Sequence, residues 1–194
     1  MGEAEPFICR VPVDLPYPQV WTASRNPAYA RAMLSNVGSN VSEMTAVSLY
    51  FYDSVILNPM YADFARCFEQ IGIVEMHHLE MFAELAFQMG GDPRLWSVQN
   101  GQMVYWTPAC GTYHQEVKKV ICRAINGEKA AVRKYRRQAE TIQDTEIVAV
   151  LKRIILDEEH HIEIFTQMLT QISGRAKSGP ETAATGTEPE DVCG

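Results

Sequence analysis

The stretch Glu75-Met76-His77-His78-Leu79-Glu80-Met81-Phe82 has a near copy 83 residues later, Glu158-Glu159-His160-His161-Ile162-Glu163-Ile164-Phe165, with five of eight positions identical. A second pair of segments, residues 43–50 and 128–135, repeats at an offset of 85 and shares Glu, Ala, Val and Tyr. Such self-similarity indicates a duplicated structural unit. The sequence therefore predicts two related helix pairs, each with one Glu-Tyr segment and one His-His segment.

Proline positions show where long helices can form, because proline breaks the interior of a helix. The ten prolines leave long proline-free blocks in which apolar residues recur at three- and four-residue spacing. This pattern predicts an all-α fold, a bundle of four helices of about 45 Å each at 1.5 Å per residue. The predicted helices cover residues 28–57, 60–89, 112–141 and 144–173, and the first can break at Gly38-Ser39-Asn40.

The remaining segments flank or connect these helices. Residues 1–27 mix prolines with apolar residues, so we expect an extended segment lying over a bundle domain of residues 28–173. Residues 174–194 have almost nothing to bury, which predicts a disordered tail. Residues 90–111 are too many for a simple turn and suit a long crossover between the second and third helices. No alternating pattern predicts a strand.

Length and composition limit the class of protein. The 194 residues, 46% of them hydrophobic, suffice for one domain with a sizeable core. A net charge of -7 argues against nucleic-acid binding, and no apolar run is long enough to predict a secretion signal or a membrane helix. The five cysteines are scattered without a Cys-x-x-Cys pair, so we interpret them as ordinary apolar or surface residues in a reducing cytoplasm.

A Glu-x-x-His motif occurs in each copy of the His-His segment. On a helix this spacing places a carboxylate and an imidazole on one face, where they can bind one metal ion together. One glutamate lies 14 to 16 residues into each predicted helix, so antiparallel packing brings all four to one level of the core. Two divalent cations would cancel their charge and make the burial tolerable. The alternative is that the glutamates are solvated and paired with Lys or Arg. Their similar positions along the four helices disfavour this alternative. The predicted metal ligands are Glu43, Glu75, His78, Glu128, Glu158 and His161.

Two tyrosines and two glycines near these ligands have competing interpretations. Tyr50 and Tyr135 each follow a predicted ligand by seven residues, so their hydroxyls either orient carboxylates across the bundle or belong to ordinary core aromatics. Gly72 and Gly127 lie inside predicted helices, where glycine costs about 1 kcal/mol. Room for a close helix or a π-bulge would explain them.

The other three histidines are not predicted to bind metal. His77 and His160 lack the three-residue spacing from the ligand glutamates, so we expect them to point outward or to support the ligands from behind. His114 stands alone near a predicted helix start and is expected at the surface.

With its paired Glu and Glu-x-x-His helices, the sequence resembles the ferritin-like superfamily of di-iron and dimanganese carboxylate proteins over residues 28–172. The rubrerythrin-like and manganese-catalase-like branches are the most similar, and the run Asp157-Glu158-Glu159-His160-His161 is similar to a bacterioferritin metal-binding helix. The resemblance implies a ferritin-like four-helix bundle with two Fe or two Mn ions per chain, and a homo-oligomer of two or more subunits.

The resemblance also implies an oxidoreductase of the non-haem peroxidase or manganese catalase type. Its small substrate would be hydrogen peroxide or dioxygen, and with iron it would need an external electron donor, because no rubredoxin Cys-x-x-Cys module is present. Tyr50 and Tyr135 are the candidate catalytic residues. Two alternatives remain open: a ferroxidase that stores or sequesters iron, and a structural coat bundle in which the metal site is a folding clip.

Overall fold

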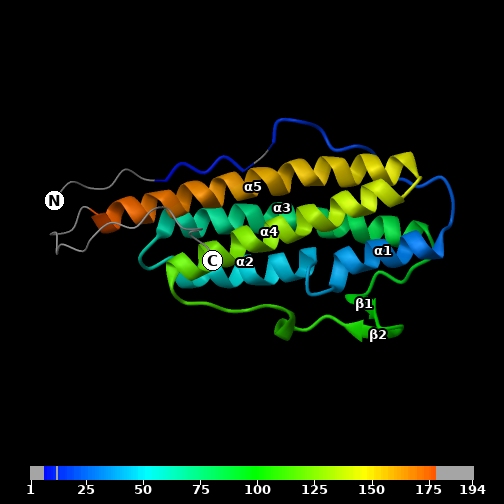
Figure 1. The fold of residues 1–194 in the computed structure, drawn as a ribbon, viewed down its shortest axis with the longest axis horizontal. Coiled ribbons are helices and arrows are strands. Elements are labelled where there is room, and N and C mark those ends of the chain that lie inside the picture. The colour runs from blue at the N-terminus through cyan, green and yellow to red at the C-terminus, as the bar shows by residue number, and fades with distance from the viewer. Residues whose placement is uncertain (1–6, 12, 178–194) are drawn as a thin grey trace.

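A computed structural model of the chain describes residues 7–11 and 13–177. These residues form an elongated antiparallel helical bundle with a small β-hairpin in its long crossover (Figure 1). The all-α bundle predicted from the sequence is confirmed. Its helices are α1 (Pro27–Gly38), α2 (Glu43–Leu57), α3 (Ala62–Gln88), α4 (Val117–Thr141) and α5 (Thr145–Lys177).

The first predicted helix is divided into α1 and α2, which follow one another along the bundle (Figure 1). α1 begins at an Asn26 cap whose side chain accepts two backbone N–H groups, with Pro27 in the first turn. It ends at Gly38, where a Cβ would lie 2.6 Å from the backbone N of Trp96. Glycine therefore allows the crossover to approach this break. As a consequence, Glu43 is the first residue of α2 rather than a mid-helix residue.

The other helix ends differ from the predicted ones by a few residues. α4 begins at Val117 rather than at 112 because the preceding residues continue the crossover. α5 reaches Lys177, four residues beyond the predicted end at 173. The predicted disordered tail lies, from residue 178 onward, outside the described residues.

The crossover contains two strands, β1 (Trp96–Gln99) and β2 (Gln102–Tyr105), which pair antiparallel. The expectation of no strand was wrong at this place. Asn100 and Gly101 both have positive φ, 51° and 76°, as required at the turn of a two-residue hairpin. A short 3₁₀ helix, η1 (Pro108–Cys110), follows before the chain enters α4.

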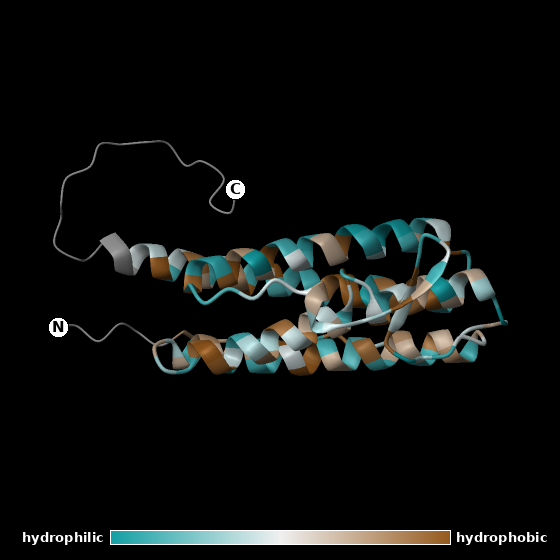
Figure 2. Cartoon of the chain, turned by 90° about the horizontal axis from the view of Figure 1, so that it is seen from below, coloured by the Kyte–Doolittle hydropathy of each residue, from teal (hydrophilic) through white to brown (hydrophobic). Residues whose placement is uncertain are grey.

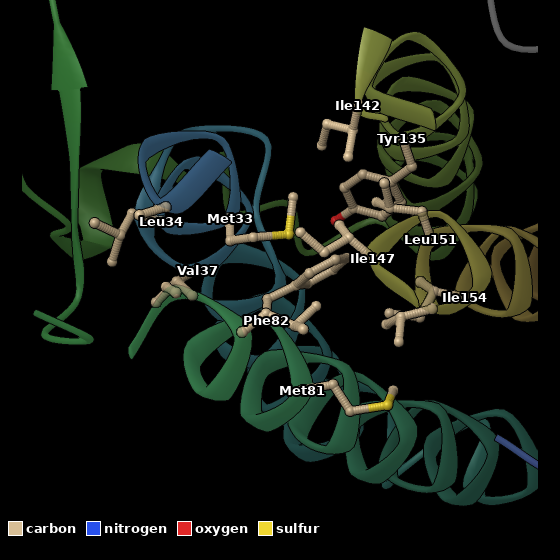
Figure 3. Close-up of a cluster of buried hydrophobic side chains, with 14 of the residues drawn as sticks. Met33, Leu34, Val37, Met81, Phe82, Tyr135, Ile142, Ile147, Leu151 and Ile154 are labelled. Atoms are coloured by element: carbon tan, nitrogen blue, oxygen red, sulfur yellow. The ribbon is translucent and has the colours of Figure 1, made fainter. Parts of the chain in front are cut away.

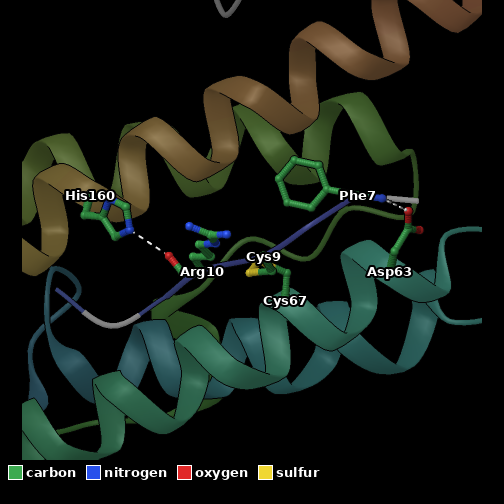
Figure 4. Close-up of a disulfide and its surroundings, with 6 residues drawn as sticks. All are labelled: Phe7, Cys9, Arg10, Asp63, Cys67 and His160. Atoms are coloured by element: carbon green, nitrogen blue, oxygen red, sulfur yellow. Dashed lines mark hydrogen bonds between the residues drawn. A yellow bond between two sulfur atoms is a disulfide. The ribbon is translucent and has the colours of Figure 1, made fainter. Parts of the chain in front are cut away.

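The N-terminal segment is attached to the bundle between α3 and α5 (Figure 4). Cys9 forms a disulfide with Cys67 of α3, and Nε2 of His160 in α5 donates to the carbonyl oxygen of Arg10 at 2.7 Å. The interpretation of the cysteines as ordinary apolar or surface residues was therefore wrong for Cys9 and Cys67. Because disulfides persist mainly in oxidising compartments, this pair removes the argument for a reducing cytoplasm, and a cytoplasmic location stays a prediction.

Two apolar clusters fill the bundle interior and leave a polar layer between them. The first cluster joins α1, the end of α3, and the facing ends of α4 and α5, and includes Phe82 and Leu151 (Figure 3). The second joins α2, the start of α3, the start of α4 and the later part of α5, and includes Phe68 and Phe165. Hydrophobic and hydrophilic residues alternate along the helices, as amphipathic packing requires (Figure 2). None of the described helices is long and apolar enough to cross a membrane.

Candidate metal centre

The six predicted ligands meet in the polar layer between the two apolar clusters. α2 and α4 each contribute one glutamate to this layer, whereas α3 and α5 each contribute a glutamate and a histidine one turn apart. No member of the set is more than 2% exposed to solvent. The converging side chains are Glu43, Glu75, His78, Glu128, Glu158 and His161.

These side chains form two overlapping groups of four, in each of which the potential ligand atoms lie within 4.8 Å of one another. Glu75 and Glu158 belong to both groups. Glu43 and His78 complete the first group, and Glu128 and His161 complete the second. We call these groups the first and second metal positions.

The two shared carboxylates each direct one oxygen toward each position. Glu75 has its Oε1 2.9 Å from Nδ1 of His161 and its Oε2 3.2 Å from Nδ1 of His78. Glu158 has its Oε2 3.1 Å from Nδ1 of His161 and its Oε1 3.4 Å from Nδ1 of His78. Two ions bound here would each have one imidazole and would share the carboxylates of Glu75 and Glu158.

The side chains fit a pair of divalent cations by their chemistry as well as by their position. Oε1 of Glu75 and Oε1 of Glu158 are buried, and although each lies near a histidine ring, neither forms a hydrogen bond of acceptable geometry with any described residue. Buried carboxylate oxygens without partners are costly, and a cation compensates them. Carboxylate and imidazole donors suit iron and manganese alike. The two clusters therefore suit a di-metal site.

In the metal-free protein, bound protons offset part of the negative charge of these buried carboxylates. Burial raises the pKa of the Glu43 and Glu128 carboxyl groups well above the usual value, and the charges of Glu75 and Glu158 add to the effect. Burial alone would lower the pKa of His161, but the carboxylates in contact with it raise this pKa to about 10.

The other histidine and Glu75 complete this proton balance. Burial likewise opposes the protonation of His78, but the charge of Glu158 and hydrogen bonds to carboxylates hold its pKa well above normal. Burial opposes ionisation of Glu75, yet the two histidines hold its pKa below the usual range.

The two tyrosines singled out in the sequence form reciprocal hydrogen bonds across the bundle. Tyr50, on the helix of Glu43, donates to Oε1 of Glu128. Tyr135, on the helix of Glu128, donates to Oε1 of Glu43. Burial raises the pKa of both phenols well above 10, so both remain protonated donors. Each non-bridging carboxylate is thus fixed in orientation by a tyrosine.

The two metal positions differ in what lies behind their histidines. Nε2 of His78 lies 3.1 Å from Oδ2 of Asp157, and the same oxygen accepts a hydrogen bond of 2.6 Å from the hydroxyl of Tyr17. Arg153 forms an ion pair with Asp157 at 2.7 Å. Nε2 of His161, in contrast, is buried without a hydrogen-bond partner among the described residues.

Sequence reasoning missed this supporting group of Asp157, Arg153 and Tyr17. One signal was available in the repeat, because Asp157 directly precedes Glu158 whereas Val74 directly precedes Glu75. Tyr17 could not be found in this way, because its position depends on the course of the N-terminal segment.

The three other histidines lie away from the ligand atoms. The ring of His77 packs against that of Tyr17 with centroids 4.8 Å apart. His160 holds the N-terminal segment, as described above. His114 is partly buried and lines a cavity beneath the crossover rather than lying fully at the surface.

A small cavity of about 70 Å³ opens onto the non-bridging side of the centre. It lies between α2 and α4, and we call it the inner chamber. Its lining includes Glu43, Glu128 and both tyrosines, Tyr50 and Tyr135. A space of this size corresponds to roughly two water-sized molecules, at about 30 Å³ each.

A model of the rubrerythrin family matches residues 38–169 of the chain. Among solved structures, the manganese catalase KatB from Anabaena is similar with a TM-score of 0.73 and 19% identity, over 91% of this chain and 86% of that one. Mycobacterium tuberculosis bacterioferritin BfrA gives a TM-score of 0.65 and 19% identity, over 78% and 89%. A dodecameric thioferritin from Bacteroides fragilis gives 0.63 and 18%, over 81% and 94%. No curated protein matches the chain in sequence. At this identity the structural likeness shows the fold.

Proposed function

The chain belongs to the rubrerythrin family, and from this membership we propose that it is a di-metal carboxylate protein that reduces or disproportionates hydrogen peroxide. Its proposed ligands are Glu43 and His78 at the first position, Glu128 and His161 at the second, with Glu75 and Glu158 bridging. Two iron or two manganese ions, each changing oxidation state by one electron, would supply the two electrons that peroxide reduction requires.

The observation that carries this proposal is the inner chamber beside the non-bridging glutamates. At about 70 Å³ it accommodates hydrogen peroxide, and its innermost wall is made of the centre's own carboxylates and their tyrosine donors. If the metal only stabilised the packing of the helices, no cavity would be needed beside Glu43 and Glu128. Peroxide or dioxygen therefore suits the chamber better than a bulky substrate.

The chain's own residues would handle the protons of the reaction. Disproportionation converts two H₂O₂ into two H₂O and one O₂, whereas peroxidase turnover converts H₂O₂, two protons and two electrons into two H₂O. Glu43 and Glu128 face the chamber, so their carboxylate oxygens are placed to accept and return these protons. Tyr50 and Tyr135 keep both carboxylates oriented toward the incoming molecule.

The experiment is peroxide consumption by protein loaded separately with manganese and with iron. The manganese form should release oxygen unaided, whereas the iron form should consume peroxide only with an added reductant. If both forms leave peroxide untouched but the iron form oxidises ferrous iron and retains it, the ferroxidase alternative replaces this proposal. If neither reaction occurs while metal raises the thermal midpoint, the structural alternative does.

We also propose a homo-oligomer. Apolar side chains on the outer faces of α2 and α3 are well exposed, including Phe51 at 70% and Ile73 at 61%. Exposed apolar side chains grouped on two neighbouring helices are typical of a surface that another subunit covers. Light scattering after size exclusion measures the assembly directly, and a monomer at micromolar concentration would contradict this.

A further inference from the structure

A second cavity lies outside the inner chamber, and the two share a wall. This outer chamber has a volume of about 500 Å³ and lies beneath the crossover, where His114 and Lys119 contribute to its lining. Five residues line both chambers, so the two spaces adjoin. The shared residues are Asn40, Thr45, Leu49, Arg123 and Gly127.

The crossover is fixed in place as the roof of the outer chamber. The indole N–H of Trp106 donates to Oγ1 of Thr45 at 2.9 Å, and the hydroxyls of Ser48 and Tyr113 lie 3.2 Å apart. Gly111 packs on Leu49 so closely that a Cβ at Gly111 would lie 2.9 Å from its Cδ2. The long crossover runs along the bundle beside α2 (Figure 1), and its residues Cys110, Gly111, Thr112 and His114 line the outer chamber.

Gly127 lies at the junction of the two chambers, and nothing in the packing requires a glycine there. A Cβ built at Gly127 would meet no heavy atom within 4 Å, whereas one at Gly72 would meet the Tyr50 side chain at 3.6 Å. Its φ is not positive, so the backbone does not require glycine either. Glycine inside a helix is unfavourable by about 1 kcal/mol relative to alanine. What the missing side chain leaves at Gly127 is open space beside Glu128.

We propose that the two chambers form one entry passage from solvent to the metal centre, and that Gly127 keeps this passage open while Leu49 narrows it. The passage ends at Glu43 and Glu128, the carboxylates on which the proposed function relies. The substrate's identity rests on that proposed function, whereas the existence of the passage does not. Any small metal-binding molecule would use it.

Arg123 lines both chambers. Its guanidinium pairs with the buried Asp53, which offsets its charge. Its Nε and Nη1 are buried without hydrogen-bond partners among the described residues. These N–H groups can donate to a small oxygen-rich molecule that passes between the chambers. An alkyl hydroperoxide offers the same acceptors but carries a bulky group that Leu49 excludes.

The test uses Gly127→Leu with Gly174→Leu as its matched control. Gly174 is also a helix glycine with nothing within 4 Å of its Cβ position, but it lies near the far end of α5. Azide binding to the metal-loaded protein is followed by stopped-flow absorbance. A side chain in a passage slows entry and exit alike, so Gly127→Leu should slow both rates by about tenfold and leave the Kd unchanged. Gly174→Leu should match the parent protein.

Two results would overturn the passage. One is azide rates in Gly127→Leu equal to those of the parent. The other is a changed Kd with unequal effects on the two rates, because this would mean that the substitution disturbs the centre itself. The opposite variant, Leu49→Ala, should admit azide faster and let tert-butyl hydroperoxide react. Unchanged azide rates in Leu49→Ala would likewise contradict the passage.

The outcomes separate this inference from the proposed function. If the parent does not consume peroxide but azide entry slows in Gly127→Leu, the proposed function fails and the passage stands. If the parent consumes peroxide and Gly127→Leu consumes it equally fast with parental azide rates, the passage alone fails.

Discussion

Metal loading should release about four protons per chain. In the metal-free protein the pKa values of His78, His161, Glu43 and Glu128 are all raised, which favours a proton on each of these groups near neutrality. Metal ligands must be deprotonated. Binding two divalent cations therefore displaces two imidazolium protons and two carboxylic protons.

The proton count is measured by isothermal titration calorimetry at pH 6.5 in buffers of different ionisation enthalpy. The slope of the observed enthalpy against the buffer enthalpy gives the number of protons released. His114→Ala is the control, because His114 lies outside the centre and should leave the count unchanged. Glu128→Gln cannot carry the displaced proton and should release about one proton fewer.

A release of one proton or none would refute this reasoning. It would mean that the centre is already deprotonated before metal arrives, and that buried carboxylates are compensated in some other way. A release that is equal in Glu128→Gln and in the parent would refute the assignment of a proton to Glu128.

Three further predictions follow from the same geometry. The free energy of unfolding of the metal-free protein should fall as pH rises from 6.5 to about 10. The pKa of His161 is raised in the folded state, so protonated His161 stabilises the fold fully below pH 6.5, and this stabilisation is lost above pH 10. Thermal melts of metal-free protein measure this, and a stability that rises over this range would contradict it. Over the same window, at a fixed metal concentration, the gap between the thermal midpoints of the loaded and metal-free protein should widen, because metal binding releases protons and so becomes tighter as pH rises. Asp157→Asn should lower the metal affinity of the first position by roughly 10- to 100-fold and leave that of the second unchanged, because Asp157 contacts the ring of His78 and not that of His161. Metal titrations in which both affinities fall equally would contradict this. His78→Ala and His161→Ala should each lower the bound metal content while His114→Ala should not, and equal metal content in all three would remove the histidines as ligands.

The duplication made much of the fold, and the convergence of the six candidate ligands, predictable. Four helices and the convergence of Glu75 and Glu158 follow from helical periodicity and a repeat, both of which are local properties of the sequence. The sequence indicated where the first helix breaks, at Gly38, but not why. The reason is that Leu95 and Trp96 of the crossover pack closely against Gly38.

The features that escaped prediction depend on contacts between distant segments. The Cys9–Cys67 disulfide joins residues 58 positions apart, and only the path of the N-terminal segment brings them together. Tyr17 reaches Asp157 for the same reason. The hairpin is different, because the dipeptide Asn100-Gly101 is typical of a two-residue hairpin turn. The strands could therefore have been predicted from the sequence.

The central claim is that one chain holds two metal ions bridged by Glu75 and Glu158. The most direct measurement is anomalous diffraction at the iron and manganese absorption edges from crystals of loaded protein. Two peaks are expected, one between Glu43 and His78 and the other between Glu128 and His161, with the carboxylates of Glu75 and Glu158 between them. A single peak, or peaks elsewhere in the bundle, would contradict it.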